Sequence, residues 1–128
     1  MTKRYLNLRG RRGNLPFSDA VMVDDTLYLS GRIGIDPATG YAPAELDQEI
    51  RYLLDGAREV LAAAGMTMDD LVQVQIFCPD LSLFERFNAA YRACFGGELP
   101  ARAFIGSGPL LRNGHFELMG IARRAAKG

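Results

Sequence analysis

Residues 43–78, PAELDQEIRYLLDGAREVLAAAGMTMDDLVQVQIFC, join a segment with helical periodicity directly to a segment with strand periodicity. The apolar residues of the first segment recur every three or four positions, as on the buried stripe of a helix: Leu46, Ile50, Leu53, Leu54, Ala57, Val60, Leu61 and Ala64. In the second segment Gln73 and Gln75 alternate with Val72, Val74, Ile76 and Cys78. The stretch therefore predicts a helix over Pro43–Ala64, stopped by Gly65, and a half-buried strand over Leu71–Cys78.

Three short strands are expected before this stretch. Tyr5–Leu8 has the composition of a short edge strand. The apolar runs Ala20–Val23 and Thr26–Ser30 are separated by Asp24 and Asp25, which predicts a hairpin with an acidic turn. The segment Asp36-Pro37-Ala38-Thr39-Gly40 predicts a turn, because proline presets one backbone dihedral and glycine tolerates a positive one.

A second helix and two more strands are expected after it. The segment Ser82-Leu83-Phe84-Glu85 matches a capping box, and Gly96-Gly97 ends the helix. The last strands are expected over Arg102–Ile105 and His115–Ala122. The inner stripe of this helix consists of Phe84, Phe87, Tyr91, Cys94 and Phe95.

This order of elements predicts an α+β sandwich, in which two helices cover one face of a mixed sheet. Residues 1–128 contain no repeat, low-complexity run or long linker, so we expect a single domain. The last strand carries Phe116 and Leu118 on one face but Met119 and Ile121 on the other. An uncovered, partly apolar sheet face predicts association of the chain with itself through the sheet.

The composition is that of an ordinary globular protein. Hydrophobic residues make up 48% of the chain and charged residues 23%, which excludes a disordered chain. Fifteen Lys and Arg balance fifteen Asp and Glu, so no net charge attracts the molecule to nucleic acid or to an anionic membrane. The cluster Lys3, Arg4, Arg9, Arg11 and Arg12 is interpreted as a solvated basic segment, with a phosphate or RNA contact as the alternative.

Cysteine and histidine usage gives no sign of a metal centre. Cys78 and Cys94 lack CxxC spacing and are interpreted as reduced core residues, and a single histidine disfavours a zinc site. No window approaches the roughly 20 apolar residues of a membrane span, and no secretory leader pattern is found. We therefore expect a cytoplasmic protein with no membrane or metal partner.

Few residues carry chemistry that the fold alone would not require. Glu117 lies in the last strand between Phe116 and Leu118, where a buried carboxylate is costly unless it is paired or used. Arg102 begins the preceding strand. An ordinary salt bridge is the alternative for either residue. Ser30 and Asn88 are polar residues in apolar segments, with a cap or a backbone hydrogen bond as the alternative.

His115 precedes Glu117 by two residues, on the same face of the predicted strand. It could adjust the proton affinity of that carboxylate, and a surface histidine is the alternative.

Several motifs, in order along most of the chain, resemble the Rid family, also called the YjgF or L-PSP endoribonuclease family. They are Leu15-Pro16-Phe17-Ser18-Asp19-Ala20, Leu29-Ser30-Gly31-Arg32-Ile33-Gly34-Ile35-Asp36-Pro37-Ala38-Thr39-Gly40, Phe87-Asn88-Ala89-Ala90-Tyr91, Pro100-Ala101-Arg102 and Phe116-Glu117. The resemblance implies a chorismate-mutase-like fold, assembled as a homotrimer with clefts between subunits. It also implies hydrolysis of reactive 2-imino and enamine acids to 2-oxo acids and ammonia, without a cofactor or metal.

Position by position, the resemblance implies roles for the candidate residues. Arg102 matches the arginine that holds the substrate carboxylate, a task that suits its planar fork. Glu117 matches the acid that positions and activates water. Ser30, the adjoining Gly31 and Asn88 match positions that line the cleft and contact substrate.

Two further substrate-binding positions depart from the family pattern. Phe17 stands where the deaminases have a tyrosine, so the ring lacks a hydroxyl group. Phe104 stands where a cysteine is frequent, so a bulkier ring occupies this part of the pocket. We expect a larger or more apolar imino acid as substrate.

Two other functions are alternatives to a deaminase. The same cleft could capture a small carboxylic acid, such as a 2-oxo acid, without catalysis. The second alternative is an RNA-binding or RNA-cleaving protein. The zero net charge and the lack of aromatic residues among the basic residues weigh against this function.

Overall fold

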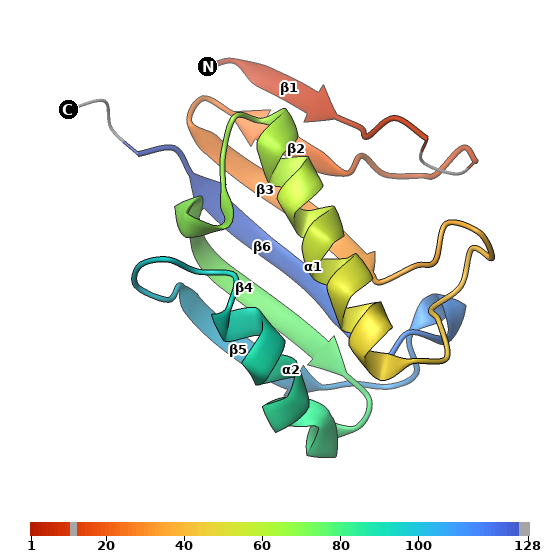
Figure 1. Cartoon of the computed structure of the whole chain (residues 1–128). Helices are drawn as coiled ribbons and strands as arrows, with labels where there is room; N and C mark the ends of the chain where they lie inside the picture. The colour runs from red at the N-terminus through yellow and green to blue at the C-terminus, as the bar shows by residue number, and fades with distance from the viewer. Residues whose placement is uncertain (11–12, 126–128) are drawn as a thin grey trace.

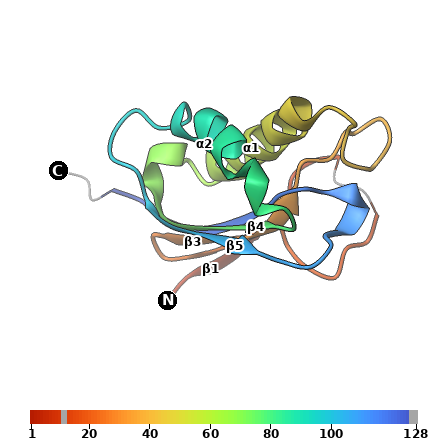
Figure 2. The same cartoon turned by 90° about the horizontal axis from the view of Figure 1, so that it is seen from below.

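Two helices lie on one face of a six-stranded sheet in the computed structural model, which describes residues 1–10 and 13–125 (Figure 1). The view along the sheet shows both helices on the same side of it (Figure 2). The strands are β1 Lys3–Leu6, β2 Ala20–Val23, β3 Thr26–Ile33, β4 Leu71–Cys78, β5 Ala101–Gly106 and β6 Glu117–Arg123. The helices are α1 Leu46–Ala63 and α2 Phe84–Arg92, with short 3-10 turns at η1 Met68–Asp70, η2 Leu81–Leu83 and η3 Leu111–Asn113. The predicted α+β arrangement is confirmed.

The strands are ordered β1-β2-β3-β6-β4-β5 across the sheet. Strands β4 and β5 are parallel, and the other neighbouring pairs are antiparallel. The chain passes from β4 to β5 through α2, because a parallel pair needs a crossover connection. Strand β6 lies between β3 and β4, and β5 forms one edge of the sheet.

The core lies between the sheet and the helices. Helix α1 buries the predicted stripe, and the strands contribute alternate residues of β2, β3, β4 and β6. The largest apolar side chains that are fully buried are Phe87, Phe116, Leu27, Ile50, Leu53, Leu61, Ile76 and Leu118. Phe87 and Phe116 join α2 to the start of β6, with ring centres 4.8 Å apart.

The prediction that Val72 faces the core is wrong. Leu71 is 4% exposed and Val72 is 50% exposed. The register between β4 and β6 shifts between Leu71 and Gln73, so the strand contains a bulge and the buried alternation resumes at Val74. A bulge adds one residue without changing the composition, which is why the alternating sequence does not reveal it.

The start of α2 also differs from the prediction. The Asp80 carboxylate, not Ser82, caps the η2 turn that leads into the helix: its Oδ1 accepts hydrogen bonds from the Ser82 backbone N–H at 3.0 Å and from the Ser82 hydroxyl at 2.7 Å. Leu83 is the N-cap of α2 itself and provides no side-chain hydrogen bond. The η2 turn follows, and the helix proper begins at Phe84. The predicted capping box is therefore replaced by an aspartate cap two residues earlier.

The remaining boundaries differ by a few residues. Strand β1 covers 3–6 instead of 5–8, and α1 covers 46–63 instead of 43–64. Strand β6 starts at Glu117, two residues after the predicted start at His115. Arg11 and Arg12 of the basic cluster lie outside the described residues.

No helix of the described residues covers the second face of the sheet. A shallow hollow of about 120 Å³ lies on it, and its lining includes Tyr28, Gln73, Gln75, Met119 and Ile121. Tyr28 is 48% exposed and Met119 is 37% exposed. None of the described helices is long and apolar enough to cross a membrane.

Candidate active site

The predicted site residues form two groups on opposite faces of the sheet. The first, here called the β5–α2 group, consists of Arg102, Phe104 and Asn88. The second, the β3–β6 group, consists of Ser30, Gly31 and Glu117. Phe17 lies in the segment before β2 and is 48% exposed.

Arg102 points from edge strand β5 toward helix α2. It pairs with the buried Val74 across the parallel ladder, so both side chains lie on the helix side of the sheet. The carbon Cζ of its guanidinium lies 4.7 Å from the ring centre of Tyr91, 5.6 Å from that of Phe84 and 5.4 Å from that of Phe104. Aromatic faces attract the cation without neutralising it. No carboxylate among the described residues pairs with this guanidinium, so its donors stay available.

Phe104 belongs partly to the core. Its ring meets Phe84 edge-on at 5.0 Å and Phe87 at 5.8 Å between ring centres. The ring is half-buried and also forms one of the three aromatic contacts of Arg102. The residue at the position of the family's cysteine therefore helps to hold the arginine.

Asn88 and Tyr91 bring unpaired polar atoms to this group. Asn88 is 7% exposed and Tyr91 is 3% exposed, yet Asn88 Oδ1 and Tyr91 Oη have no hydrogen-bond partner among the described residues. Residues 84, 88 and 91 share one face of a helix, so Asn88 lies between the two α2 rings that contact Arg102. Burial raises the pKa of Tyr91 to about 12, while the positive charge of Arg102 opposes this shift. Tyr91 was predicted as a residue of the inner stripe and not as a site residue; its spacing from Asn88 was the available signal.

The β3–β6 group is organised by a close approach between two strands. Glu117 begins β6 opposite Ile33, on the face away from the helices, and is half-buried. A Cβ atom at Gly31 would lie 3.1 Å from the Glu117 carboxyl carbon and 3.3 Å from Oε2. The register of β3 shifts between Leu29 and Arg32, which places Gly31 at this irregularity. Glycine thus leaves the space that the carboxylate occupies.

Ser30 connects β3 to the segment before β2. Its hydroxyl donates to the Ser18 carbonyl oxygen at 2.6 Å, and its backbone N–H donates to the Asp19 carbonyl oxygen at 3.0 Å. These bonds hold the segment that follows Phe17. A contact between Ser30 and substrate stays a prediction.

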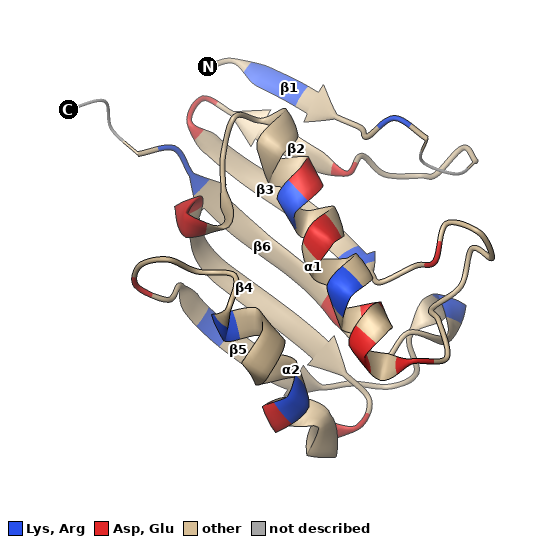
Figure 3. Ribbon diagram, viewed as in Figure 1, with Lys and Arg blue, Asp and Glu red and all other residues tan. Residues whose placement is uncertain are grey.

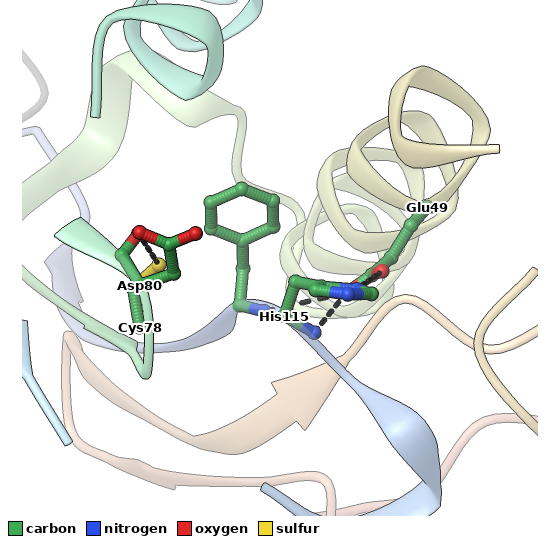
Figure 4. Close-up of polar contacts among 5 residues, drawn as sticks. Glu49, Cys78, Asp80 and His115 are labelled. Atoms are coloured by element: carbon green, nitrogen blue, oxygen red, sulfur yellow. Dashed lines mark hydrogen bonds and ion pairs between the residues drawn. The ribbon is translucent and has the colours of Figure 1, made fainter. Parts of the chain in front are cut away.

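His115 does not share a face with Glu117, and that prediction is wrong. The residue precedes β6, and its ring Nδ1 lies 2.7 Å from Oε1 of Glu49 in α1 (Figure 4). Glu49 is fully buried and accepts hydrogen bonds from the backbone N–H groups of His115 at 2.6 Å and Phe116 at 3.3 Å. Glu49 was not among the predicted site residues. Its position on the helical stripe with Leu46, Ile50 and Leu53 was the signal.

Arg102 and Glu117 do not meet within one chain. Arg102 is in register with Val74, and Glu117 is in register with Phe77 of the same strand. Val74 and Phe77 are three residues apart and point to opposite faces. The arginine thus lies under α2, while the carboxylate lies on the uncovered face.

No three His, Cys, Asp or Glu side chains of the described residues are grouped so that they could hold a metal ion. Acidic and basic residues are interspersed along α1 and α2 (Figure 3).

The family model described as Endoribonuclease L-PSP matches residues 12–124. The chain belongs to the L-PSP family. A mouse (Mus musculus) member named 2-iminobutanoate/2-iminopropanoate deaminase is 36% identical over 108 residues, which cover 84% of this chain and 80% of that protein.

Solved structures of L-PSP family members have the same fold. The YjgF gene product of E. coli is 28% identical with a TM-score of 0.86, and the match covers 95% of this chain and 99% of that one. A protein of the conserved Rid family, YyfA from Yersinia pestis, is 28% identical with a TM-score of 0.88, covering 96% and 100%. The resemblance to the Rid family is thereby confirmed, together with the fold that it implied.

Proposed function

We propose that the protein hydrolyses reactive 2-imino and enamine acids to 2-oxo acids and ammonia, in clefts between the subunits of a homotrimer. The observation that carries this proposal is the Arg102 guanidinium, which three aromatic rings hold while its donors remain without a carboxylate. A guanidinium group that is held in one orientation at a sheet edge, with its N–H donors available, can bind the carboxylate of a small acid. The name of the 36% identical mouse relative supports the same chemistry.

The two groups explain why more than one copy is needed. Arg102 and Glu117 lie on opposite faces of one sheet, so a site that uses both takes each from a different copy. Arg102 lies on the edge strand β5, where a neighbouring copy can approach. The exposed Tyr28 and Met119 on the open face supply apolar surface for the association. A cyclic trimer repeats such a contact three times and closes it.

The reaction needs little beyond orientation and proton transfer. Arg102 binds the substrate carboxylate, which places the electrophilic iminium carbon near the β3–β6 group of the next copy. Glu117 orients a water molecule and accepts its proton as the carbon–oxygen bond forms. The proton then passes to the nitrogen, the carbon–nitrogen bond breaks, and ammonia leaves as the 2-oxo group forms. One imine and one water thus give one oxo acid and one ammonia.

Phe17 and Phe104 support a preference for larger or more apolar imino acids. Neither side chain offers a hydroxyl or thiol to a ligand, and Phe17 is about half exposed before any partner binds. An apolar substrate side chain would cover this surface. Because Cys78 and Cys94 are free thiols, a reducing cytoplasm is the setting that we propose.

The test produces 2-iminopropionate and a bulkier imino acid with an amino-acid oxidase and traps the surviving imine with semicarbazide. We expect the wild type to suppress trapping. The rate of imine hydrolysis should fall at least about 100-fold in Arg102→Ala and in Glu117→Ala. The matched controls are Arg58→Ala and Glu85→Ala, which remove exposed charges from the helices. Wild-type activity in Arg102→Ala would refute the assigned site. Failure of the wild type to suppress trapping, with 2-oxo acid binding in calorimetry, would make the protein a binding module.

A further inference from the structure

We propose that Glu49 and His115 are positioning residues for Glu117. They fasten the start of β6 to α1 and so hold the Glu117 carboxylate in the space beside Gly31. This inference rests on the proposed function of Glu117 and assigns a role to two residues that lie on the other side of the sheet.

The Glu49 carboxylate is a specific anchor. It is fully buried, where an ionised group is costly unless every oxygen is paired. Oε2 accepts the backbone N–H groups of His115 and Phe116, and Oε1 contacts the His115 ring. All three contacts therefore go to the two residues immediately before Glu117. Phe116 is itself fully buried against Phe87, which limits movement of the backbone between the anchor and the site.

The same turn of α1 touches the end of β3. Gly34 follows β3, and a Cβ atom there would collide with the Glu49 backbone oxygen and lie 3.0 Å from the Leu53 nitrogen. Helix and strand thus approach as closely as glycine allows. Gly31 and Glu117, which contact each other in the site, stand near the end of β3 and at the start of β6. The turn of α1 that contains Glu49 contacts the chain near Gly31 and next to Glu117. It can therefore fix the position of Glu117 relative to Gly31.

His115 contributes the third bond to this anchor. Its side chain is 50% exposed, whereas the Glu49 carboxylate that it contacts is fully buried. A proton on Nδ1 lets the ring donate to Glu49 Oε1 in both its neutral and charged forms. The other ionisable groups nearby are Asp80, in the turn after β4, and the buried thiol of Cys78, which donates to the Asp80 carbonyl oxygen at 3.1 Å (Figure 4).

The experiment measures kcat and KM for imine hydrolysis in His115→Ala, His115→Asn and Glu49→Gln. Asparagine carries an amide N–H near the position of Nδ1 and can replace the donated bond without titrating. Glutamine keeps one oxygen for the two backbone N–H groups. We expect His115→Ala to lower kcat about tenfold with KM changed less than about twofold, because Glu117 acts on water while Arg102 binds the substrate. In Glu49→Gln the neutral imidazole can carry its proton on Nε2 and accept the new amide N–H at Nδ1. His115→Asn and Glu49→Gln should therefore keep kcat within about threefold of the wild type.

Hydrogen exchange of the His115 and Phe116 amides provides a readout that does not depend on turnover. Both amides should be protected in the wild type and in His115→Asn, and should exchange faster in His115→Ala. Unchanged kcat in a folded His115→Ala protein would overturn the inference, as would a His115→Asn protein as impaired as His115→Ala. If His115→Ala does not fold, loss of kcat in folded His115→Asn would overturn it equally. An inactive wild type would instead refute the proposed function.

Discussion

Arg102 illustrates how a cation can be held in place without being neutralised. Its Cζ atom lies 4.7 to 5.6 Å from three ring centres, and each ring attracts the cation. A carboxylate partner would orient the group equally well but would occupy the donors. The aromatic contacts therefore preserve the bidentate binding capacity of the residue.

The planar shape of the Arg102 guanidinium matters as well as its charge. Arg102→Lys keeps the positive charge but loses the planar guanidinium and its pair of parallel N–H donors. We expect the Kd for a 2-oxo acid to rise at least about tenfold in calorimetry, with the stability to urea little changed. Arg58→Lys, an exposed replacement on α1, is the control. Equal affinity in Arg102→Lys and wild type would show that only charge is needed.

Gly31 is required for space and not for backbone freedom. A Cβ atom there would meet the Glu117 carboxyl carbon at 3.1 Å, and a flexible side chain can move away from it. Gly31→Ala should therefore reduce kcat about tenfold or more. Its free energy of unfolding should stay within about 1 kcal/mol of the wild-type value. Gly97→Ala, where a Cβ meets nothing within 4 Å, is the matched control. Full activity in Gly31→Ala would contradict the close packing of this carboxylate.

Tyr91 gives the β5–α2 group a pH signature. Its pKa is raised from the ordinary value of 10 to about 12, so the folded state keeps this proton more tightly than the unfolded chain. The associated stability is complete below pH 10 and is lost as the pH rises from 10 through 12. Urea unfolding should show a steeper loss of stability over this range in the wild type than in Tyr91→Phe. Parallel pH profiles for the two proteins would contradict the burial of the hydroxyl.

Periodicity predicts the elements because burial of one face imposes it. Both helices and all six strands were predicted in the correct order, with ends that differ by a few residues. The bulge at Val72 was not predicted, because it depends on the register of β4 against β6. The late start of β6 was not predicted, because the preceding residues bond to Glu49 of α1. A charged residue on an apolar helical stripe was the one available sign of that anchor.

The bulge in β4 makes its own prediction. Val72→Ala removes methyl groups that are half exposed, whereas Val74→Ala removes the same groups from the core. We expect Val74→Ala to lower the free energy of unfolding by about 2 kcal/mol or more and Val72→Ala by less than about 0.5 kcal/mol. Comparable losses in urea unfolding would mean that both valines are buried and that the strand alternates without a bulge.

At the scale of the whole molecule, the two faces of the sheet have different tasks. One carries the core and the Arg102 guanidinium, and the other exposes Glu117 beside apolar residues such as Met119. Sequence patterns identified these residues but could not show that they lie on opposite faces, since that follows from the register of β4 with β5 and β6. A site that uses both is consequently a property of the assembly.

Mixing two inactive variants tests this central claim most directly. Arg102→Ala and Glu117→Ala chains are unfolded together, refolded and assayed for imine hydrolysis. In a mixed trimer, one contact joins an intact Arg102 to an intact Glu117 of the next copy, so random mixing should restore about one quarter of the wild-type activity. Each variant refolded alone should stay inactive. If the mixture is as inactive as its components although mixed trimers form, both residues act within one chain and the shared site is contradicted.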